Sequence, residues 1–310
     1  MRLSDLGFVD LYLGRERVLA KRLVGALIDP SPIPHECLGD ASLLFSLCEK
    51  AAQIHPSGEF QIIHDGVAYR ASSLQSKNEL TFVLRRAEPE VMALDAIGLT
   101  PSALRCLMAP GLKGMILVCG PFGCGKTTTI AAITIARLKR FGGVAITIED
   151  PTELPMDGMH GTGVCYQTEV TPERSFALGC KQAARQNPDI IFLGELRDRS
   201  AAIESQMAAI NGRTVVSSMH ASSIPSALER LTQMSGGENS SAEIASLLSA
   251  GLSAILYQEF VGNPKSLKTE FLFIPQGADG DGIRSLIKDQ KFKQLSTSIQ
   301  SQLAQSRFQS

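Results

Sequence analysis

Short, uninterrupted apolar runs alternate with helical patterns over the second two thirds of the chain. The runs are rich in β-branched residues, and they are GMILVCG (114–120), VAITIED (144–150), DIIFLGE (189–195) and RTVVSSMH (213–220). A strand loses its polar alternation when both of its faces are buried, as in a parallel sheet that is covered by helices. The pattern therefore predicts a mostly parallel α/β domain.

Helix boundaries and a helical tail accompany these runs. Thr171, Pro172 and Glu173 predict a helix start, because they offer a cap, a proline at the first helical position and an acid in the first turn. Asn211 and Gly212 predict the end of the helix SAAIESQMAAI. Residues 240–260 and 282–305 carry further helical patterns.

The N-terminal part follows a different pattern. The segments EFQIIHDGVAYRASS (59–73) and ELTFVLRRAEP (79–89) are β-rich, and HDG at 64–66 is typical of a hairpin turn. Residues 1 to about 90 are predicted to form a small α+β unit. We place the domains at 1–92 and 93–310.

Composition limits the classes of protein that remain. The chain has 310 residues, of which 44% are hydrophobic, enough for one large or two modest domains. Its net charge of −1 creates no chain-wide positive field, so nucleic-acid binding would need a local basic patch.

The cysteine pattern and the hydropathy of the chain predict a cytoplasmic protein. The 7 cysteines are scattered without a C-x-x-C pair, which favours reduced thiols over a disulfide framework or a zinc site. No apolar run approaches the roughly 18 residues of a membrane span. Charges interrupt the first residues too often for a secretory leader.

A phosphate-binding loop follows the first predicted strand of the α/β domain. The stretch from Gly120 through Gly125-Lys126-Thr127 fits the pattern G-x-x-x-x-G-K-[ST], and a predicted helix comes directly after it. The backbone N–H groups would surround phosphate oxygens, the lysine would reach the β and γ phosphates, and the threonine hydroxyl would bind Mg²⁺. The predicted nucleotide-binding residues are Gly120, Gly123, Gly125, Lys126, Thr127 and Thr128.

Acids and a histidine end the other predicted strands. Glu195 is either a ligand beside Mg²⁺ and the attacking water or an ordinary surface glutamate. Glu149, Asp150 and Glu153 should face the nucleotide crevice, and one of them is expected to handle water. His220 either senses the γ-phosphate or has a structural role.

The motif segments together resemble the secretion ATPase superfamily, the hexameric motors of type II and type IV secretion and of type IV pili. The similarity covers about residues 90 to 300: GPFGCGKTTT resembles the Walker A motif, TIEDPTEL the Asp box, ARQNPDIIFLGELRD the Walker B motif and GRTVVSSMHASS the His box. The short N-terminal domain, the lack of a tetracysteine element and the segment GIRSLIKD (282–289) are more similar to the PilT pilus-retraction branch and its conjugative and type IVB relatives.

The resemblance implies an α/β fold: a C-terminal RecA-like P-loop NTPase domain behind a smaller N-terminal α+β, PAS-like domain. It implies ATP and Mg²⁺ as cofactors, with Thr127 and Glu195 at the metal and Glu153 as the general base. It also implies that His220 is catalytic, and that Arg70 and Arg85 reach a nucleotide at a subunit interface.

The chain departs from the family pattern at three positions. Tyr12 stands where a histidine is usual, and Thr168 and Lys77 stand where arginines are usual. These departures weaken the assignment of the interface arginines more than that of the Walker motifs.

The function expected from this resemblance is that of a mechanical ATPase. The chain would form a homohexamer and drive pilus retraction or secretion, held at the inner membrane through a platform protein. The helical segment GIRSLIKD would either transmit motion to that machinery or simply cap the domain. The alternatives are a nucleic-acid translocase with the same core and a nucleotide-gated scaffold without turnover.

Overall fold

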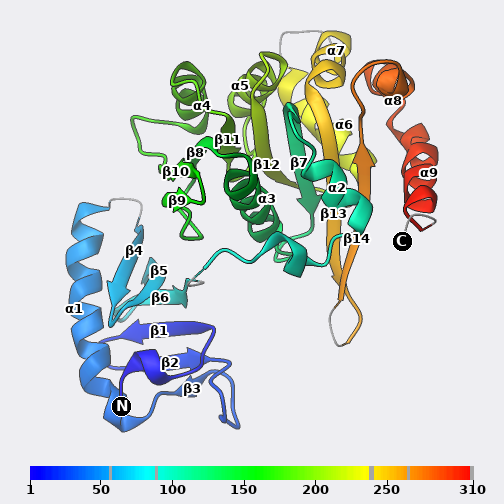
Figure 1. Ribbon diagram of the computed structural model, residues 1–310. Coiled ribbons are helices and arrows are strands. Elements are labelled where there is room, and N and C mark those ends of the chain that lie inside the picture. Colours follow the sequence, from blue (N-terminus) through cyan, green and yellow to red (C-terminus); the bar gives the residue numbers. More distant parts are fainter. Residues whose placement is uncertain (56–57, 88–89, 237–240, 264–265, 308–310) are drawn as a thin grey trace. The chain divides into compact units, whose positions relative to one another are not determined.

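The structure is a computed structural model that describes residues 1–55, 58–87, 90–236, 241–263 and 266–307 (Figure 1). The chain divides into two compact units. The first contains Met1–Glu90 and Pro151–Pro155, and the second contains Val91–Asp150 and Met156–Ser310.

The first unit is an antiparallel sheet with the strand order β3-β2-β1-β6-β5-β4. Its strands are β1 (Asp10–Gly14), β2 (Val18–Lys21), β3 (Ser31–Pro32), β4 (Glu59–His64), β5 (Val67–Gln75) and β6 (Leu80–Arg86). The predicted hairpin is present: Asp65 and Gly66 join β4 to β5 with φ of 49° and 75°, the positive values that a tight primed turn requires. Residues 88–89 of the predicted run 79–89 lie outside the described residues.

Helix α1 (Leu38–Ile54) covers this sheet, preceded by the short helices η1 (Leu3–Asp5) and η2 (His35–Cys37). Ala41, Leu44, Phe45 and Cys48 recur at three- and four-residue steps and are buried on the face of α1 that packs on the sheet. The same core contains Tyr69 and other buried strand residues.

The second unit is a mixed α/β fold built on a sheet with the order β14-β13-β7-β12-β11-β8-β10-β9. Neighbouring strands from β13 to β10 are parallel, and β14 and β9 are antiparallel at the edges. The strands are β7 (Gly114–Gly120), β8 (Gly143–Ile148), β9 (Gly158–His160), β10 (Gly163–Tyr166), β11 (Ile190–Leu193), β12 (Thr214–His220), β13 (Leu252–Val261) and β14 (Ser266–Phe273).

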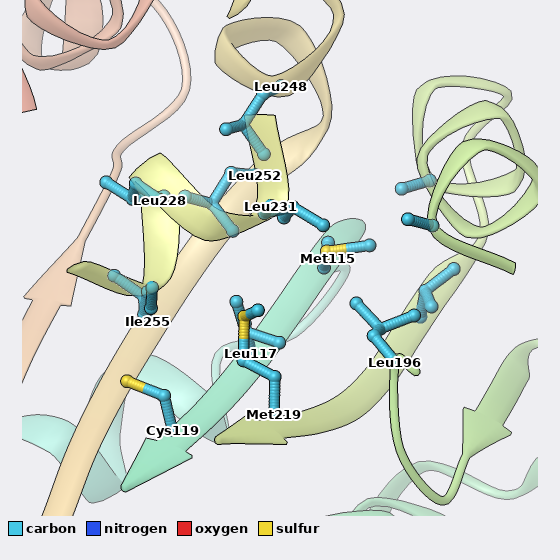
Figure 2. Close-up of a cluster of buried hydrophobic side chains, with 14 of the residues drawn as sticks. Met115, Leu117, Cys119, Leu196, Met219, Leu228, Leu231, Leu248, Leu252 and Ile255 are labelled. Atoms are coloured by element: carbon cyan, nitrogen blue, oxygen red, sulfur yellow. The ribbon is translucent and has the colours of Figure 1, made fainter. Parts of the chain in front are cut away.

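Helices cover both faces of this sheet. They are η3 (Leu94–Ile97), α2 (Pro101–Leu107), α3 (Lys126–Phe141), α4 (Phe176–Arg185), α5 (Arg199–Ile210), α6 (Ile224–Gly236), α7 (Ser241–Gly251), α8 (Ala278–Lys288), η4 (Phe292–Gln294) and α9 (Leu295–Arg307). On β7, Met115, Leu117 and Cys119 join the core cluster formed with α4 to α7 (Figure 2). Ile116 and Val118 point to the opposite face, where α3 contacts the strand. Full burial of each aliphatic side chain stabilises the fold by about 1.5–3 kcal/mol, so β7 is held from both sides.

Helix α9 is attached to the edge strand β14 by its side chains. The Gln302 amide accepts a hydrogen bond from Phe273 N at 2.9 Å and donates one to Phe273 O at 2.7 Å. A single glutamine thus satisfies both backbone groups of a residue on the open edge of the sheet.

The predicted strands 114–120, 144–150, 189–195 and 213–220 are β7, β8, β11 and β12, and the predicted helix end is confirmed by α5, which is capped by Asn211. The predicted helix start at Thr171 is wrong. Thr171 and Arg174 form a tight turn, and Ser175 caps α4 instead by accepting a hydrogen bond from Leu178 N.

The helical tail is only partly correct. Residues 282–305 lie in α8, η4 and α9, but the pattern over 240–260 is helical only as far as Gly251, and its second half is β13. Ser240 lies outside the described residues. Leu252 to Tyr257 pair with β7 in the middle of the sheet, and this tertiary pairing overrides the local helical periodicity.

Candidate active site

The phosphate-binding loop connects β7 to α3. Gly125 precedes the first helical residue, Lys126, with a φ of 81°, a left-handed conformation that favours glycine. Thr127 and Thr128 lie half-buried in the first turn of α3, where helix geometry leaves backbone N–H groups without intrahelical acceptors. Gly123 lies in the exposed turn of the loop.

The loop is held from behind by β13. A Cβ on Gly120 would lie 2.1 Å from Gln258 O, so no larger residue fits at this position. The buried Gln258 amide donates to Cys124 O at 2.6 Å and accepts from Thr129 Oγ1 at 2.8 Å. These bonds tie the C-terminal part of the loop and the first turn of α3 to β13.

Lys126, His220 and Glu195 meet at the carboxyl edge of the parallel strands. Lys126 Nζ lies 3.2 Å from Gly120 O, 2.8 Å from Pro121 O and 3.2 Å from His220 Nδ1. His220 Nε2 lies 3.4 Å from Glu195 Oε1. The histidine thus bridges the lysine of the phosphate loop and the acid that follows β11, because β12 lies between β7 and β11.

The contacts of His220 assign its tautomer. A lysine ammonium can only donate, so Nδ1 must accept from Lys126 and therefore carries no proton. The proton of the neutral ring is then on Nε2, where it can be donated to Glu195. A catalytic role for His220 remains a prediction, which these two contacts support.

The turn that carries Glu195 is fixed by β12 and by an arginine. Ser218 Oγ donates to Gly194 O at 2.7 Å, and Leu196 N donates to Ser218 O at 2.9 Å. Arg197 Nε lies 3.1 Å from Glu195 Oε2, and a terminal nitrogen of Arg197 lies 3.6 Å from Asp150 Oδ2. Glu195 is therefore a positioned carboxylate at the site, and not an isolated surface residue.

The three acids of the Asp box have different environments. Glu149 is 2% exposed and accepts a hydrogen bond from Gln167 Nε2 at 2.9 Å, so the expectation that it faces a crevice is wrong. Asp150 is exposed and paired with Arg197. Glu153 belongs to the first unit, where its Oε1 lies 3.0 Å from an Arg70 guanidinium nitrogen. Its role as general base remains a prediction.

The second predicted interface arginine, Arg85, is also paired within the first unit. Its Nε lies 2.7 Å from Asp10 Oδ1, and a terminal nitrogen lies 3.1 Å from Oδ2. This two-point bond to Asp10 raises the pKa of the guanidinium. A role at another subunit's nucleotide would require Arg85 to exchange or share this partner.

Several other residues in or near the site depart from the family pattern or were not predicted from the sequence. Thr168 N donates to Thr147 Oγ1 on β8, and the Thr168 hydroxyl donates to Thr147 O, so these contacts are structural. The sequence motifs did not predict the role of Gln258. They also gave no role to Phe122, whose ring stacks on the His220 ring. Burial raises the pKa of the Cys124 thiol inside the loop, so a reactive thiolate is not favoured there.

The residues present fit the phosphates of a nucleotide and a magnesium ion. The loop offers an ammonium group, a helix N-terminus and a backbone that β13 holds in place, which is the donor set that binds polyphosphate. Thr127 and Glu195 offer the hydroxyl and carboxylate oxygens that Mg²⁺ prefers.

The chain is similar in sequence to proteins of secretion and pilus systems. The type II secretion system protein E of Klebsiella pneumoniae is 35% identical over 201 residues, which are 63% of this chain and 38% of that protein. The type IV pilus ATPase PilU of Pseudomonas aeruginosa is 31% identical over 221 residues, 71% of this chain and 53% of that protein. The chain thus spans less than two thirds of the length of these curated relatives.

The fold is similar to that of a solved pilus motor and of a solved ATPase. A crystal structure of the pilus retraction motor PilT with bound ADP has a TM-score of 0.79 at 27% identity and covers 96% of this chain and 87% of that chain. The ATPase DotB of Legionella pneumophila, at 19% identity and a TM-score of 0.73, shares the fold over 93% of this chain and 83% of its own. Across the residues that the structure describes, no helix combines the length and the apolar character that a bilayer crossing needs.

Residues 56–297 match the family described as type II/IV secretion system protein. That match covers more than half of the chain and includes β7, β8, β11 and β12, whose carboxyl ends form the site. The chain therefore belongs to the type II/IV secretion system protein family.

Proposed function

We propose that this chain is an ATPase that hydrolyses ATP to ADP and phosphate and couples the reaction to mechanical work in a pilus or secretion system. The observation that carries the proposal is the meeting of Lys126, His220 and Glu195 at one edge of the sheet. Phosphoryl transfer to water uses a cation at the phosphates and a group that positions the water, and carboxylates and imidazoles are common proton-transfer groups.

Each residue has a role that follows from its contacts. Lys126 neutralises developing charge on the phosphates, and the first turn of α3 binds them through backbone N–H groups. Mg²⁺, held by Thr127 and Glu195, would draw charge from the phosphate oxygens. His220 holds its proton on Nε2 and orients the Glu195 carboxylate.

The similarity to PilT and PilU supports a motor role, and family membership supports a place in a secretion or pilus machine. We infer a homohexamer, located in the cytoplasm against the inner membrane and held there by a membrane platform protein. Arg70 and Arg85 are the candidates to act on the nucleotide of a neighbouring subunit, and Glu153 is the candidate base.

The test is phosphate release by the purified chain with ATP and Mg²⁺, compared with the Lys126→Ala variant. We expect turnover that the variant lacks. Binding of a fluorescent ATP analogue without turnover would favour a nucleotide-gated scaffold instead. Stimulation by DNA that disappears as salt is raised would favour a nucleic-acid translocase.

A further inference from the structure

Phe122 is an exposed aromatic residue inside the phosphate-binding loop. Phe122 is 88% exposed. Large apolar side chains are usually buried, because an exposed phenyl ring gains no hydrophobic stabilisation. The ring contact that the structure shows for it is with His220: the ring centroids lie 5.7 Å apart and the planes differ by 13°. This is the geometry of an offset stack.

The contacts of His220 fix its backbone but only weakly restrain rotation of its imidazole ring. Its backbone is fixed in β12, where it lies opposite Gly120 of β7, and Arg230 donates a hydrogen bond to its carbonyl at 3.1 Å. The ring, however, can rotate about the Cβ–Cγ bond, and the contacts at Nδ1 and Nε2 are long, at 3.2 Å and 3.4 Å. Bonds of that length restrain a ring weakly.

The stacked phenyl ring supplies the missing restraint. A ring parallel to the imidazole fixes the imidazole plane, and the polar contacts then decide which nitrogen faces which partner.

We propose that Phe122 is a positioning residue for the reaction: it holds the His220 ring in the plane in which Nδ1 accepts from Lys126 and Nε2 donates to Glu195. The inference rests on the proposed ATPase function, but the ring orientation can be measured without turnover. Phe122 itself acts only through His220.

Two substitutions of Phe122 distinguish the effect of its aromatic ring from the effect of its volume. Phe122→Leu keeps an apolar side chain of similar volume without an aromatic face, and Phe122→Tyr keeps the face. Phe141→Leu is a matched control, since Phe141 is a half-exposed phenyl at the far end of α3, where it contacts Arg137 and Arg140.

In ATPase assays on the full chain, Phe122→Leu should lower kcat by roughly three- to tenfold, the factor to which the energy of one aromatic pair corresponds. KM for ATP should stay nearly unchanged, because Lys126 and the loop backbone remain in place. Phe122→Tyr should restore kcat, and Phe141→Leu should match the wild-type protein.

Proton NMR of the histidine rings gives the readout that is independent of turnover. The ring current of Phe122 should move the His220 ring-proton signals upfield, identified by their loss in His220→Gln. The shift should disappear in Phe122→Leu and persist in Phe122→Tyr. Wild-type kcat in Phe122→Leu, a higher kcat, or an unmoved His220 signal would each overturn the inference. A wild-type chain without ATPase activity would refute the proposed function, while the NMR result would still decide the orientation.

Discussion

Lys126 joins the phosphate-binding loop to the residues of the neighbouring strands. The residue is 7% exposed, and its ammonium group lies among loop carbonyls and the His220 ring. A buried cation is costly unless polar groups surround it, and here those groups are the ones that would share it with phosphate. The side chain is thus held where its charge is needed.

Lys126→Ala should lower kcat for ATP hydrolysis on the order of 100-fold or more, because a pre-positioned cation at the phosphates is lost. Phosphate release by the purified variant measures this. Lys139→Ala, an exposed lysine near the other end of α3, is the control and should leave kcat unchanged. Turnover within twofold of wild type in Lys126→Ala would exclude the lysine from the reaction.

Glu195→Gln should stop hydrolysis and leave ATP binding nearly intact. The amide keeps the shape of the carboxylate but loses its charge, and its one acceptor oxygen cannot accept from both Arg197 and His220. We expect a kcat loss on the order of 100-fold or more, as for other charged groups that stabilise a transition state. A filter-binding assay measures ATP affinity in parallel. Half of the wild-type rate in this variant would show that Glu195 is misassigned.

At the scale of elements, the Arg284 side chain adds hydrogen bonds to the apolar packing of α8 against α7. A terminal nitrogen of Arg284 on α8 donates to Ser249 O near the end of α7, and a second contacts Pro275 O at 3.5 Å. Burial lowers the pKa of this guanidinium. Neither sequence-based interpretation of this segment, a silent cap or a transmitter of motion, includes this structural bond.

Arg284→Ala should therefore destabilise the second unit by about 1.5–3 kcal/mol, the range for hydrogen bonds to a charged group. Thermal denaturation of the full chain measures the change. Lys288→Ala, an exposed cation on the same helix, should shift the midpoint little. If the thermal midpoints of both variants match that of the wild-type protein, the Arg284–Ser249 bond does not stabilise the fold.

In the first unit, Asp40 joins α1 to the chain start and to the β4–β5 hairpin. It accepts a hydrogen bond from Leu3 N at 2.7 Å, and its other oxygen lies 2.6 Å from His64 Nε2. Burial alone would raise the pKa of Asp40, but the bonds from Leu3 and His64 outweigh it and hold the pKa below the ordinary value of 3.8.

Asp40→Asn should lower the thermal stability of the protein near neutral pH, by about 1–2 kcal/mol for a lost charged hydrogen bond. Because the folded-state pKa is depressed, the ionised group stabilises the fold above pH 3.8, and this contribution is lost as the pH falls through the folded value. The difference between wild type and variant should therefore shrink in acid. A constant difference from pH 7 to pH 3 would contradict the assignment.

The sequence predicts elements well where burial alone decides their pattern. The strands β7, β8, β11 and β12 are covered on both faces, so their apolar runs identify them, and the ends of parallel strands bring Lys126 and His220 to one edge. Strand β13 was not predictable, because its apolar residues continue the helical spacing of α7 and only pairing with β7 makes it a strand. The contact of Phe122 with His220 depends on how the two side chains are oriented, and no sequence pattern predicts that orientation.

For the whole molecule, the central question is whether neighbouring copies complete each other's sites. Both candidate arginines are paired within their own chain, Arg70 with Glu153 and Arg85 with Asp10. The Arg70–Glu153 pair is partly exposed and is worth about 0–1 kcal/mol, so a nucleotide on another subunit can compete for Arg70. Arg85 binds the buried Asp10 through two contacts, and breaking such a pair is costly, so Arg85 would have to share this partner with the nucleotide.

Mixtures of Lys126→Ala and Arg85→Ala chains should regain part of the ATPase activity, because some interfaces then join an intact loop to an intact arginine. Activity of the wild-type chain should also rise more than linearly with its concentration. Arg15→Ala, which breaks an exposed pair with Glu49, is the control and should be active alone. No rescue at any ratio, for Arg70→Ala as well as Arg85→Ala, would rule out action between subunits.

The attachment of the loop to β13 also defines a path for mechanical load. Gln258 bonds the loop and α3 to β13, β13 pairs with β14 along an antiparallel ladder, and Gln302 fastens α9 to β14. The hydrogen bonds of such a ladder lie perpendicular to the strands. A pull on α9 along the strand direction therefore loads them together in shear, and the tension reaches the phosphate-binding loop through the ladder, the backbone of β13 and the Gln258 side chain.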